Sequence, residues 1–357
     1  MYKILQFIDS LTIGGAERMC VNISNVLNRD GNKVYLCISR NSGELEAFID
    51  DNIEICRLKK RSKFDLFAFL RLLKFVINNK IEIIHAHSSS IYWVTLIKIF
   101  KPSLLVVWHD HYGLSESLTD KDRKVLKFCS YFIDAIISVN ETLKKWSLKN
   151  MKVKGSKIVF INNFPLLPVI NRLNNREEIN LLCMANFREQ KDHITLIKAI
   201  SIVLSKKPDS NIKLILAGTY SDNEYYRNVL ELIHNYNLKD VVSIRGAVQN
   251  IADLLAITDI GILSSVSEGL PVTLLEYGLA KLPVVVTDVG QCSDVIGAGK
   301  YGWLVKSQSP DELANALIYI IDNIEEAKLK GIDLHSHVTK NYGGQSFVQK
   351  YYSLINS

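Results

Sequence analysis

The chain has 357 residues and a net charge of +6, and 48% of its residues are hydrophobic while 22% are charged. This composition excludes a largely disordered chain and is ordinary for a protein that buries a core. At about 150 residues per domain, the length predicts two domains.

Short β-branched segments alternate with amphipathic stretches in the first half of the chain. The segments are KILQFI, KVYLCIS, IEICRL, IEIIHAH, LLVVWH, DAIISV and KIVFIN. Helical patterns lie between them at 16–28, 64–78 and 121–132. This alternation predicts a mostly parallel sheet with helices on both faces, in an N-terminal Rossmann-like domain over residues 1–165.

The pattern restarts after residues 162–178, which are rich in Pro and Asn, have no clear period and are therefore interpreted as a linker. The second set of strands is INLLCMAN, IKLILAG, VVSIRG, IGILSS, PVVVTD and GWLV. Helices are predicted at 194–205, 224–235, 251–255, 272–280 and 310–323. These elements predict a second Rossmann-like domain over residues 166–340. Residues 341–357 predict a terminal helix that could cross back to the first domain.

The predicted fold is therefore α/β, with two doubly wound domains that face each other across a cleft. Sheets of this kind bind ligands at the carboxyl ends of their strands.

Targeting features and cysteines predict the cellular compartment of the protein. We interpret residues 1–10 as a first strand rather than a signal peptide, and no apolar run approaches the ~20 residues of a membrane span. The six scattered cysteines form no C-x-x-C pair, which favours free thiols in a reducing compartment. We expect a cytoplasmic protein, with peripheral contact at the inner face of the membrane left open.

Charge is unevenly distributed along the chain. Residues 1–165 carry 25 Lys and Arg against 16 Asp and Glu, whereas residues 166–357 carry 18 against 21. The net charges of the two parts are thus +9 and −3. A basic first domain, including KKRSK at 59–63 and Lys144–Lys145, favours an anionic partner, although a solvated surface remains the plainer interpretation. No nucleic-acid-binding module is recognisable.

The segment SEGLPVTLLEYGLAKLPVVVTDVG, at 267–290, places two carboxylates beside a predicted core helix. Pro271 favours the first helical position, so Val272 and Thr273 are expected in the first turn. The free amides and the positive end of the helix dipole there suit a diphosphate, and a glycine at 269 permits close approach. Glu268 and Glu276 could accept hydrogen bonds from the hydroxyls on either side of a diphosphate in a nucleotide-sugar. A helix cap and a partly exposed helical glutamate are the structural alternative.

This segment closely resembles the signature of glycosyltransferase family 4, which contains retaining enzymes of the GT-B fold. The resemblance implies that Glu268 contacts the donor sugar and that Glu276 binds the ribose hydroxyls. The donor would also meet the backbone at Gly269, Leu270, Val272 and Thr273.

Further motifs extend the resemblance. GGAER places Gly14 and Gly15 at a strand-to-helix turn; it is not a G-x-G-x-x-G fingerprint, and it resembles the N-terminal donor-binding loop of the family. Arg188 and Lys191 in ANFREQKDH resemble the pair that binds the diphosphate and stabilises the charge of the leaving group. A solvated helix start is the alternative for that pair.

Two other stretches also match. Gly246 and Val248, in SIRGAV, lie where the nucleobase packs against backbone in the family. VVWHDHYG supplies His109, whose implied role is contact with the sugar near the reacting carbon, together with Asp110 and His111 as acceptor-binding candidates. Which of the two histidines faces the ligand stays open, and we favour His109.

A metal site is conceivable at three H-x-H pairs, but no Cys or carboxylate cluster completes one, so neither a metal nor another cofactor is expected. The prediction is a retaining hexosyltransferase that uses a nucleotide-diphosphate sugar, with UDP-sugar favoured. Its acceptor would be a glycan or a polyprenyl-diphosphate-linked glycan in bacterial capsule or O-antigen synthesis. A sugar-nucleotide epimerase and a non-catalytic binding subunit are the alternatives. Sugar, base, linkage and oligomeric state are not readable from the sequence.

Overall fold

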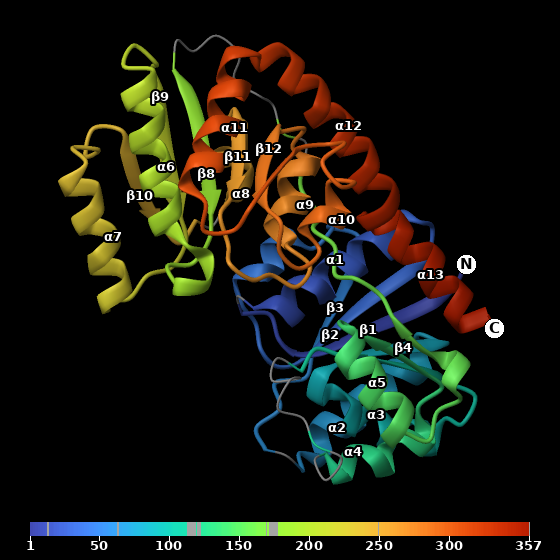
Figure 1. Cartoon of the computed structure of the whole chain (residues 1–357). Coiled ribbons are helices and arrows are strands. Elements are labelled where there is room, and N and C mark those ends of the chain that lie inside the picture. Colours follow the sequence, from blue (N-terminus) through green and yellow to red (C-terminus); the bar gives the residue numbers. More distant parts are fainter. Residues whose placement is uncertain are drawn as a thin grey trace. The chain divides into compact units, whose positions relative to one another are not determined.

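The computed structural model describes residues 1–12, 14–62, 64–112, 119, 123–168, 170, 178–248 and 250–356. Lys63 of the basic cluster, the start of the helix predicted at 121, and residues 169 and 171–177 of the predicted linker lie outside the described residues. The chain divides into two compact units, shown in Figure 1. Unit 1 comprises Met1–Phe164 and Gly343–Ser357, and unit 2 comprises Pro165–Tyr342.

In the described part of unit 1, seven parallel strands form one sheet in the order β3-β2-β1-β4-β5-β6-β7. Each strand coincides with one of the predicted apolar segments. They are β1 (Lys3–Ser10), β2 (Lys33–Asn41), β3 (Glu54–Arg57), β4 (Ile83–His87), β5 (Leu105–Asp110), β6 (Ala135–Ser138) and β7 (Ile158–Phe160). The chain order reverses direction between β1 and β4, and such a switch point is where doubly wound sheets bind ligands.

Helices cover both faces of this sheet. They are α1 (Gly15–Arg29), α2 (Leu66–Asn78), α3 (Ile91–Phe100), α4 (Lys124–Cys129), α5 (Glu141–Asn150) and α13 (Gly344–Asn356), with the short 3-10 turns η1 (Glu44–Phe48), η2 (Ser88–Ser90), η4 (Ser130–Phe132) and η5 (Gly155–Lys157). One core cluster joins α2, α3, α4 and α5 to the sheet, and another joins α1 and α13 to its other face.

The C-terminal helix α13 is part of the core of unit 1. Phe347 and Tyr351 are buried in the cluster that also contains residues of α1 and the sheet. The hydroxyl of Tyr352 donates to Asp30 over 2.7 Å and accepts from the amide of Asn32 over 2.6 Å. Figure 1 shows α13 running beside the strands near the N-terminus. The predicted terminal helix therefore exists and completes unit 1.

Unit 2 repeats the architecture. In its described residues, six parallel strands form a sheet in the order β10-β9-β8-β11-β12-β13. These strands are β8 (Ile179–Met184), β9 (Ile212–Ala217), β10 (Val242–Gly246), β11 (Ile260–Leu263), β12 (Val284–Thr287) and β13 (Trp303–Val305). The reversal of direction lies between β8 and β11, so the ends of these two strands are the expected ligand position in this unit.

The helices of unit 2 include five that match the predicted ranges closely and two, at Cys292–Val295 and Ile324–Tyr342, that were not predicted. They are α6 (His193–Lys206), α7 (Glu224–Asn235), α8 (Ile251–Ala256), α9 (Val272–Leu279), α10 (Cys292–Val295), α11 (Pro310–Asp322) and α12 (Ile324–Tyr342), with the turn η6 (Glu189–Lys191) before α6. The doubly wound α/β prediction is confirmed. Among the helices of the described residues, none has the length and hydrophobicity that crossing a bilayer requires.

Candidate functional site

A cavity in unit 2 opens beyond the carboxyl ends of β8 and β9. Its volume is about 360 Å³. It is lined by residues that follow β8 and β9, by the segment after β10 and by the first turns of α9, namely Met184, Ala185, Asn186, Lys191, Ala217, Gly218, Thr219, Ala247, Val248, Ile251, Thr273 and Glu276. The predicted donor-binding residues Lys191, Val248, Thr273 and Glu276 thus come together although they are spread over the second half of the chain.

The start of α9 presents backbone amides near this cavity. Pro271 is the residue before the helix, with an extended ψ of 94°, and its carbonyl accepts from the amide of Leu274 over 3.0 Å. The expectation that Pro271 occupies the first helical position is therefore wrong by one residue, because the chain is still extended there. Val272 and Thr273 lie in the first turn as expected, and amides in that turn have no acceptor within the helix.

Helix α9 is held firmly by Tyr277. The hydroxyl of this fully buried tyrosine donates to the carbonyl of Leu182 over 3.0 Å and accepts from the amide of Met184 over 2.8 Å. Its ring lies over Gly261 on β11, where an added Cβ would come within 2.6 Å of the ring. One face of α9 is thereby fastened to β8 and β11, which leaves Thr273 and Glu276 to line the cavity.

A partly buried ion pair beside the cavity joins two predicted catalytic residues. Lys191 Nζ lies 2.6 Å from Glu268 Oε1, and their side chains are only 24% and 9% exposed. Ser265 Oγ donates to the same carboxylate oxygen over 2.6 Å. Because few water molecules reach this pair, its electrostatic interaction is less screened than that of a surface ion pair.

The loop that carries Glu268 is fixed from two sides. The amide of Val266 donates to the carbonyl of Gln190 over 2.8 Å, and Gln190 Nε2 donates to the carbonyl of Ser267 over 2.8 Å. On the other side, Gly290 has a φ of +54°, and an added Cβ would come within 1.9 Å of the carbonyl oxygen of Glu268. A left-handed backbone against a neighbouring carbonyl is a position that only glycine fits.

The other predicted residues of unit 2 lie around the cavity rather than in it. Arg188 is exposed and precedes η6, and it does not line the cavity. Gly246 has a φ of +63° at the end of β10, and Leu270 packs on the core cluster of α9. Gly269 is exposed, and an added Cβ there would meet no atom within 4 Å.

Three polar residues at this site were missed by sequence reasoning. Asn186 and Thr219 line the cavity, and Asn186 Oδ1 accepts from the amide of Thr219 over 2.9 Å. Ser265, which binds Glu268, was the third. Asn186 and Thr219 follow strands directly, and that position was the available signal.

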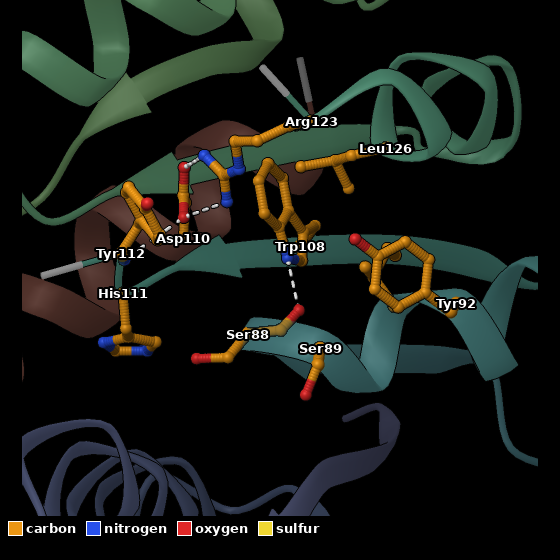
Figure 2. Close-up of a pocket in the computed structure, with 10 residues that line it drawn as sticks. Ser88, Ser89, Tyr92, Trp108, Asp110, His111, Tyr112, Arg123 and Leu126 are labelled. Carbon is orange, nitrogen blue, oxygen red and sulfur yellow. Dashed lines mark hydrogen bonds and ion pairs between the residues drawn. The ribbon is translucent and has the colours of Figure 1, made fainter. Parts of the chain in front are cut away.

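Unit 1 contains a second pocket, of about 360 Å³, at the carboxyl ends of β4 and β5. Figure 2 shows its lining, which consists of Ser88, Ser89, Ile91, Tyr92, Trp108, Asp110, His111, Tyr112, Arg123 and Leu126. The predicted acceptor-binding residues Asp110 and His111 both belong to it. Trp108 closes one side, because its indole nitrogen donates to the carbonyl of Ser88 over 2.9 Å.

Asp110 is paired with an arginine that sequence reasoning did not identify. Arg123 binds it through two parallel hydrogen bonds of 2.7 and 2.8 Å, as Figure 2 shows. The carboxylate is 1% exposed and the guanidinium 16%. The guanidinium also lies 5.1 Å from the ring centre of Trp108 and 4.9 Å from that of Tyr112. Such a fork-shaped pair fixes both groups in place.

Four histidines stack beneath this pocket. His85 and His87 on β4 lie beside His109 and His111, because the register pairs His87 with His109. Burial lowers the pKa of His85 to about 3, and it likewise lowers the pKa of His87 and His109 well below the usual value. These rings are therefore neutral at physiological pH.

The position of His109 bears directly on its expected role. Its ring is fully buried, and neither ring nitrogen has a hydrogen-bond partner among the residues that the structure describes. His111, in contrast, is partly exposed and lines the pocket, although desolvation still lowers its pKa to about 3. His111 is thus the histidine at the pocket wall.

Within the described residues, His85, His87 and His109 bring one nitrogen each to within 4.8 Å of the others. The rings of His85 and His87 stack at 19°, and those of His85 and His109 at 12°. The rings of His87 and His109 are tilted by 30°, with their centres 5.5 Å apart.

The glycine turn of unit 1 lies at the carboxyl end of β1. Gly14 is the extended residue before α1, and Gly15 is the first residue of that helix. The Glu17 side chain covers Gly14, since an added Cβ would come within 2.3 Å of its carboxylate.

Comparison with known proteins agrees with this architecture. A family model described as glycosyl transferases group 1 matches residues 170–330, and one described as glycosyltransferase family 4 matches residues 13–164. The chain belongs to the family 4 glycosyltransferases, which have the GT-B fold.

Named relatives are similar over most of their length. The amylovoran biosynthesis glycosyltransferase AmsD of Erwinia amylovora is 25% identical, with all of both chains covered. The UDP-Gal:alpha-D-GlcNAc-diphosphoundecaprenol alpha-1,3-galactosyltransferase of Escherichia coli is 23% identical over 87% of this chain and 86% of its own. Among solved structures, HepE of Anabaena in complex with UDP-glucose has a TM-score of 0.71 at 16% identity, with complete coverage of both chains, and thus supports the fold.

Proposed function

We propose that this glycosyltransferase retains the anomeric configuration and transfers a hexose from a nucleotide-diphosphate sugar, with a UDP-sugar favoured. The acceptor is a hydroxyl of a glycan or of a polyprenyl-diphosphate-linked glycan in bacterial surface polysaccharide synthesis. The observation that carries the donor assignment is the cavity of unit 2. Thr273, Glu276 and Lys191 line this cavity together, beside the Lys191–Glu268 ion pair.

The groups that we assign to the donor each match one part of it. Glu276 accepts hydrogen bonds from the ribose hydroxyls, and the backbone near Gly246 and Val248 contacts the base. The amides of Val272 and Thr273, with the helix dipole behind them, bind the diphosphate, and Gly269 and Leu270 allow it to approach. Glu268 accepts hydrogen bonds from hydroxyls of the sugar.

Charge develops on the diphosphate as the bond to the sugar breaks. Lys191 and Arg188 stabilise this charge, and Lys191 is already oriented by Glu268 and so needs little rearrangement. The phosphate oxygen that leaves can take the proton of the acceptor hydroxyl, which attacks from the same face of the sugar. Cys183, close beneath Lys191, takes no part as a nucleophile, because burial raises the pKa of its thiol to about 12.

The acceptor assignment rests on the pocket of unit 1. Asp110, held by Arg123, can accept a hydrogen bond from an acceptor hydroxyl, and the neutral ring of His111 can either donate or accept one. His109 keeps a role in this proposal as the ring that stacks on His111 and positions it, since their ring centres lie 4.1 Å apart. The E. coli relative whose name specifies a diphosphoundecaprenol acceptor supports a lipid-linked glycan and hence work at the inner face of the membrane.

Nucleotide binding tests the donor site. Thermal shift with UDP, GDP, ADP, CMP and UMP, with and without Mg²⁺, is expected to show metal-independent stabilisation by one diphosphate. Lys191→Met should abolish that shift, while Lys207→Met, which removes the surface lysine paired with Asp322 in the same unit, should leave it intact.

Reaction products separate the alternatives. Proton NMR of the product should show the same anomeric configuration as the donor. An inverted product would refute retention, an epimerised nucleotide-sugar would indicate the epimerase, and failure to bind any nucleotide would indicate a non-catalytic subunit.

A further inference from the structure

The outer face of three helices in unit 1 is apolar, which is the reverse of what a solvent-facing helix normally shows. Helix α2 buries Ala68, Leu72 and Val76 against the sheet. Its opposite face nevertheless exposes Phe67, at 75%, and Ile77. A helix that is apolar on both faces normally has a partner on each.

The neighbouring helices continue this face. On α3, Leu96, Ile99 and Phe100 are exposed, the last at 64%, and they are spaced to lie on one side of the helix. On α4, Val125 and Phe128 are both 64% exposed.

The three helices are adjacent. Phe69 of α2 contacts Trp93 and Phe100 of α3, with ring centres 6.1 and 5.8 Å apart. Residues of all three helices belong to one core cluster on the same side of the sheet, and Figure 1 shows them together at the lower end of unit 1. Their exposed apolar side chains therefore lie on neighbouring helices, and we call them together the apolar face. Soluble monomers rarely expose so many large apolar side chains together.

The charged residues within these three helices are all basic. The three helices contain five basic residues and no Asp or Glu, and these basic residues are Arg71, Lys74, Lys98, Lys124 and Lys127. Two carboxylates near these helices among the described residues are already engaged, since Asp134 pairs with Lys98 and Asp65 caps the start of α2. Apolar and aromatic side chains mixed with Lys and Arg match the boundary region of a bilayer that contains anionic lipids.

We infer that the apolar face of α2, α3 and α4 docks on an anionic lipid bilayer. Its position relative to the pocket fits this role, because Tyr92 of α3 and Leu126 of α4 line that pocket. A polar head group held by Asp110 and Arg123 would then lie next to its own lipid chain. The inference deepens the proposed function on the acceptor side, where it rests on a lipid-linked acceptor, but docking itself needs no donor.

Vesicle co-sedimentation tests the docking. The protein should sediment with phosphatidylcholine vesicles that contain phosphatidylglycerol, and binding should fall when phosphatidylglycerol is omitted or salt is raised. The variant Leu96→Ser/Phe100→Ser should lower partitioning about tenfold, and Lys124→Glu/Lys127→Glu should do the same. The matched control is Leu329→Ser/Ile332→Ser, which removes two exposed apolar side chains from α12 in unit 2 and should bind as the parent does.

Three results would overturn the inference. The parent protein could fail to bind either kind of vesicle, or the control pair could lose as much binding as the face variants. A parent that is dimeric in sedimentation velocity, with monomeric Leu96→Ser/Phe100→Ser, would assign the face to a second copy of the chain. Thermal shift with nucleotide should be unchanged in all these variants, so a failure of docking is distinguishable from a failure of the donor site.

Discussion

Lowering the pH is expected to unfold unit 1 through its buried histidines. In the folded state the pKa of His85 and of His111 is about 3, because the interior disfavours the charged ring. In the unfolded chain each has the ordinary pKa of about 6.5. Between these two values the unfolded state binds more protons, so stability falls as pH falls through this window.

The magnitude follows from linkage. One pKa unit corresponds to about 1.4 kcal/mol, so moving from about pH 7 to about pH 5 should cost about 2 kcal/mol for His85 alone. Burial is the main cause of the lowered pKa of His85, and repulsion between its protonated ring and that of His111 adds to it. His87 and His109 act in the same direction. The cluster can therefore remove a large part of the 5–15 kcal/mol that stabilises a typical domain.

Urea unfolding followed by tryptophan fluorescence measures this effect. Of the four tryptophans, Trp93, Trp108 and Trp146 lie in unit 1, so a Trp303→Phe background makes the signal report on that unit. In that background, His85→Leu should reduce the loss of unfolding free energy between the two pH values by about 2 kcal/mol. His234→Leu, on the exposed surface of α7, is the control. If His85→Leu shows the same pH dependence as its background, the reasoning is refuted.

Three further predictions concern single side chains. Gly290→Ala should lower the free energy of unfolding by at least about 1–2 kcal/mol through backbone strain, as measured by thermal melting. It should also sharply lower kcat by displacing the loop that carries Glu268. Turnover equal to that of the wild type would contradict the role given to that loop. In urea unfolding, Tyr351→Phe should leave stability unchanged or raise it by up to about 1 kcal/mol, because the buried hydroxyl has no hydrogen-bond partner among the described residues. A loss of stability would instead reveal such a partner. Arg123→Lys should break the pair of hydrogen bonds to Asp110 and raise KM for the acceptor while leaving KM for the donor unchanged. Steady-state kinetics with each substrate varied in turn measures both constants, and an equal rise in both would contradict the prediction.

Local patterns in the sequence were sufficient to predict the strands and most helices of both units. A segment such as PVVVTD is short, β-branched and bounded by turn residues, so it identifies β12 without tertiary information. The helices α3, α5, α10 and α12 were not among the predictions. Helix α3 has apolar residues on nearly all of its sides, and such a pattern has no period by which a helix could be detected.

Many members of the candidate site were predictable from motifs, but their pairings were not. Glu268 and Lys191 were each selected from motifs, yet their contact joins residues 77 positions apart and depends on how β8 and β11 meet. The burial of His109 depends on strand register and on α13, which closes over the sheet from the far end of the chain. Arg123 belongs to no motif, and nothing in the local sequence connects it with Asp110.

The placement of α13 also constrains how the polypeptide is made. Unit 2 is continuous in sequence, whereas unit 1 is built from both ends of the chain. During translation, unit 2 has all of its residues before unit 1 receives Phe347 and Tyr351, which pack in its core. In a nascent chain, one face of the first sheet therefore lacks part of its cover while nearly two hundred residues are added. Ribosome-bound intermediates should consequently expose α1 and the β1–β4 surface to chaperones, and that exposure should end only when the last helix emerges from the exit tunnel.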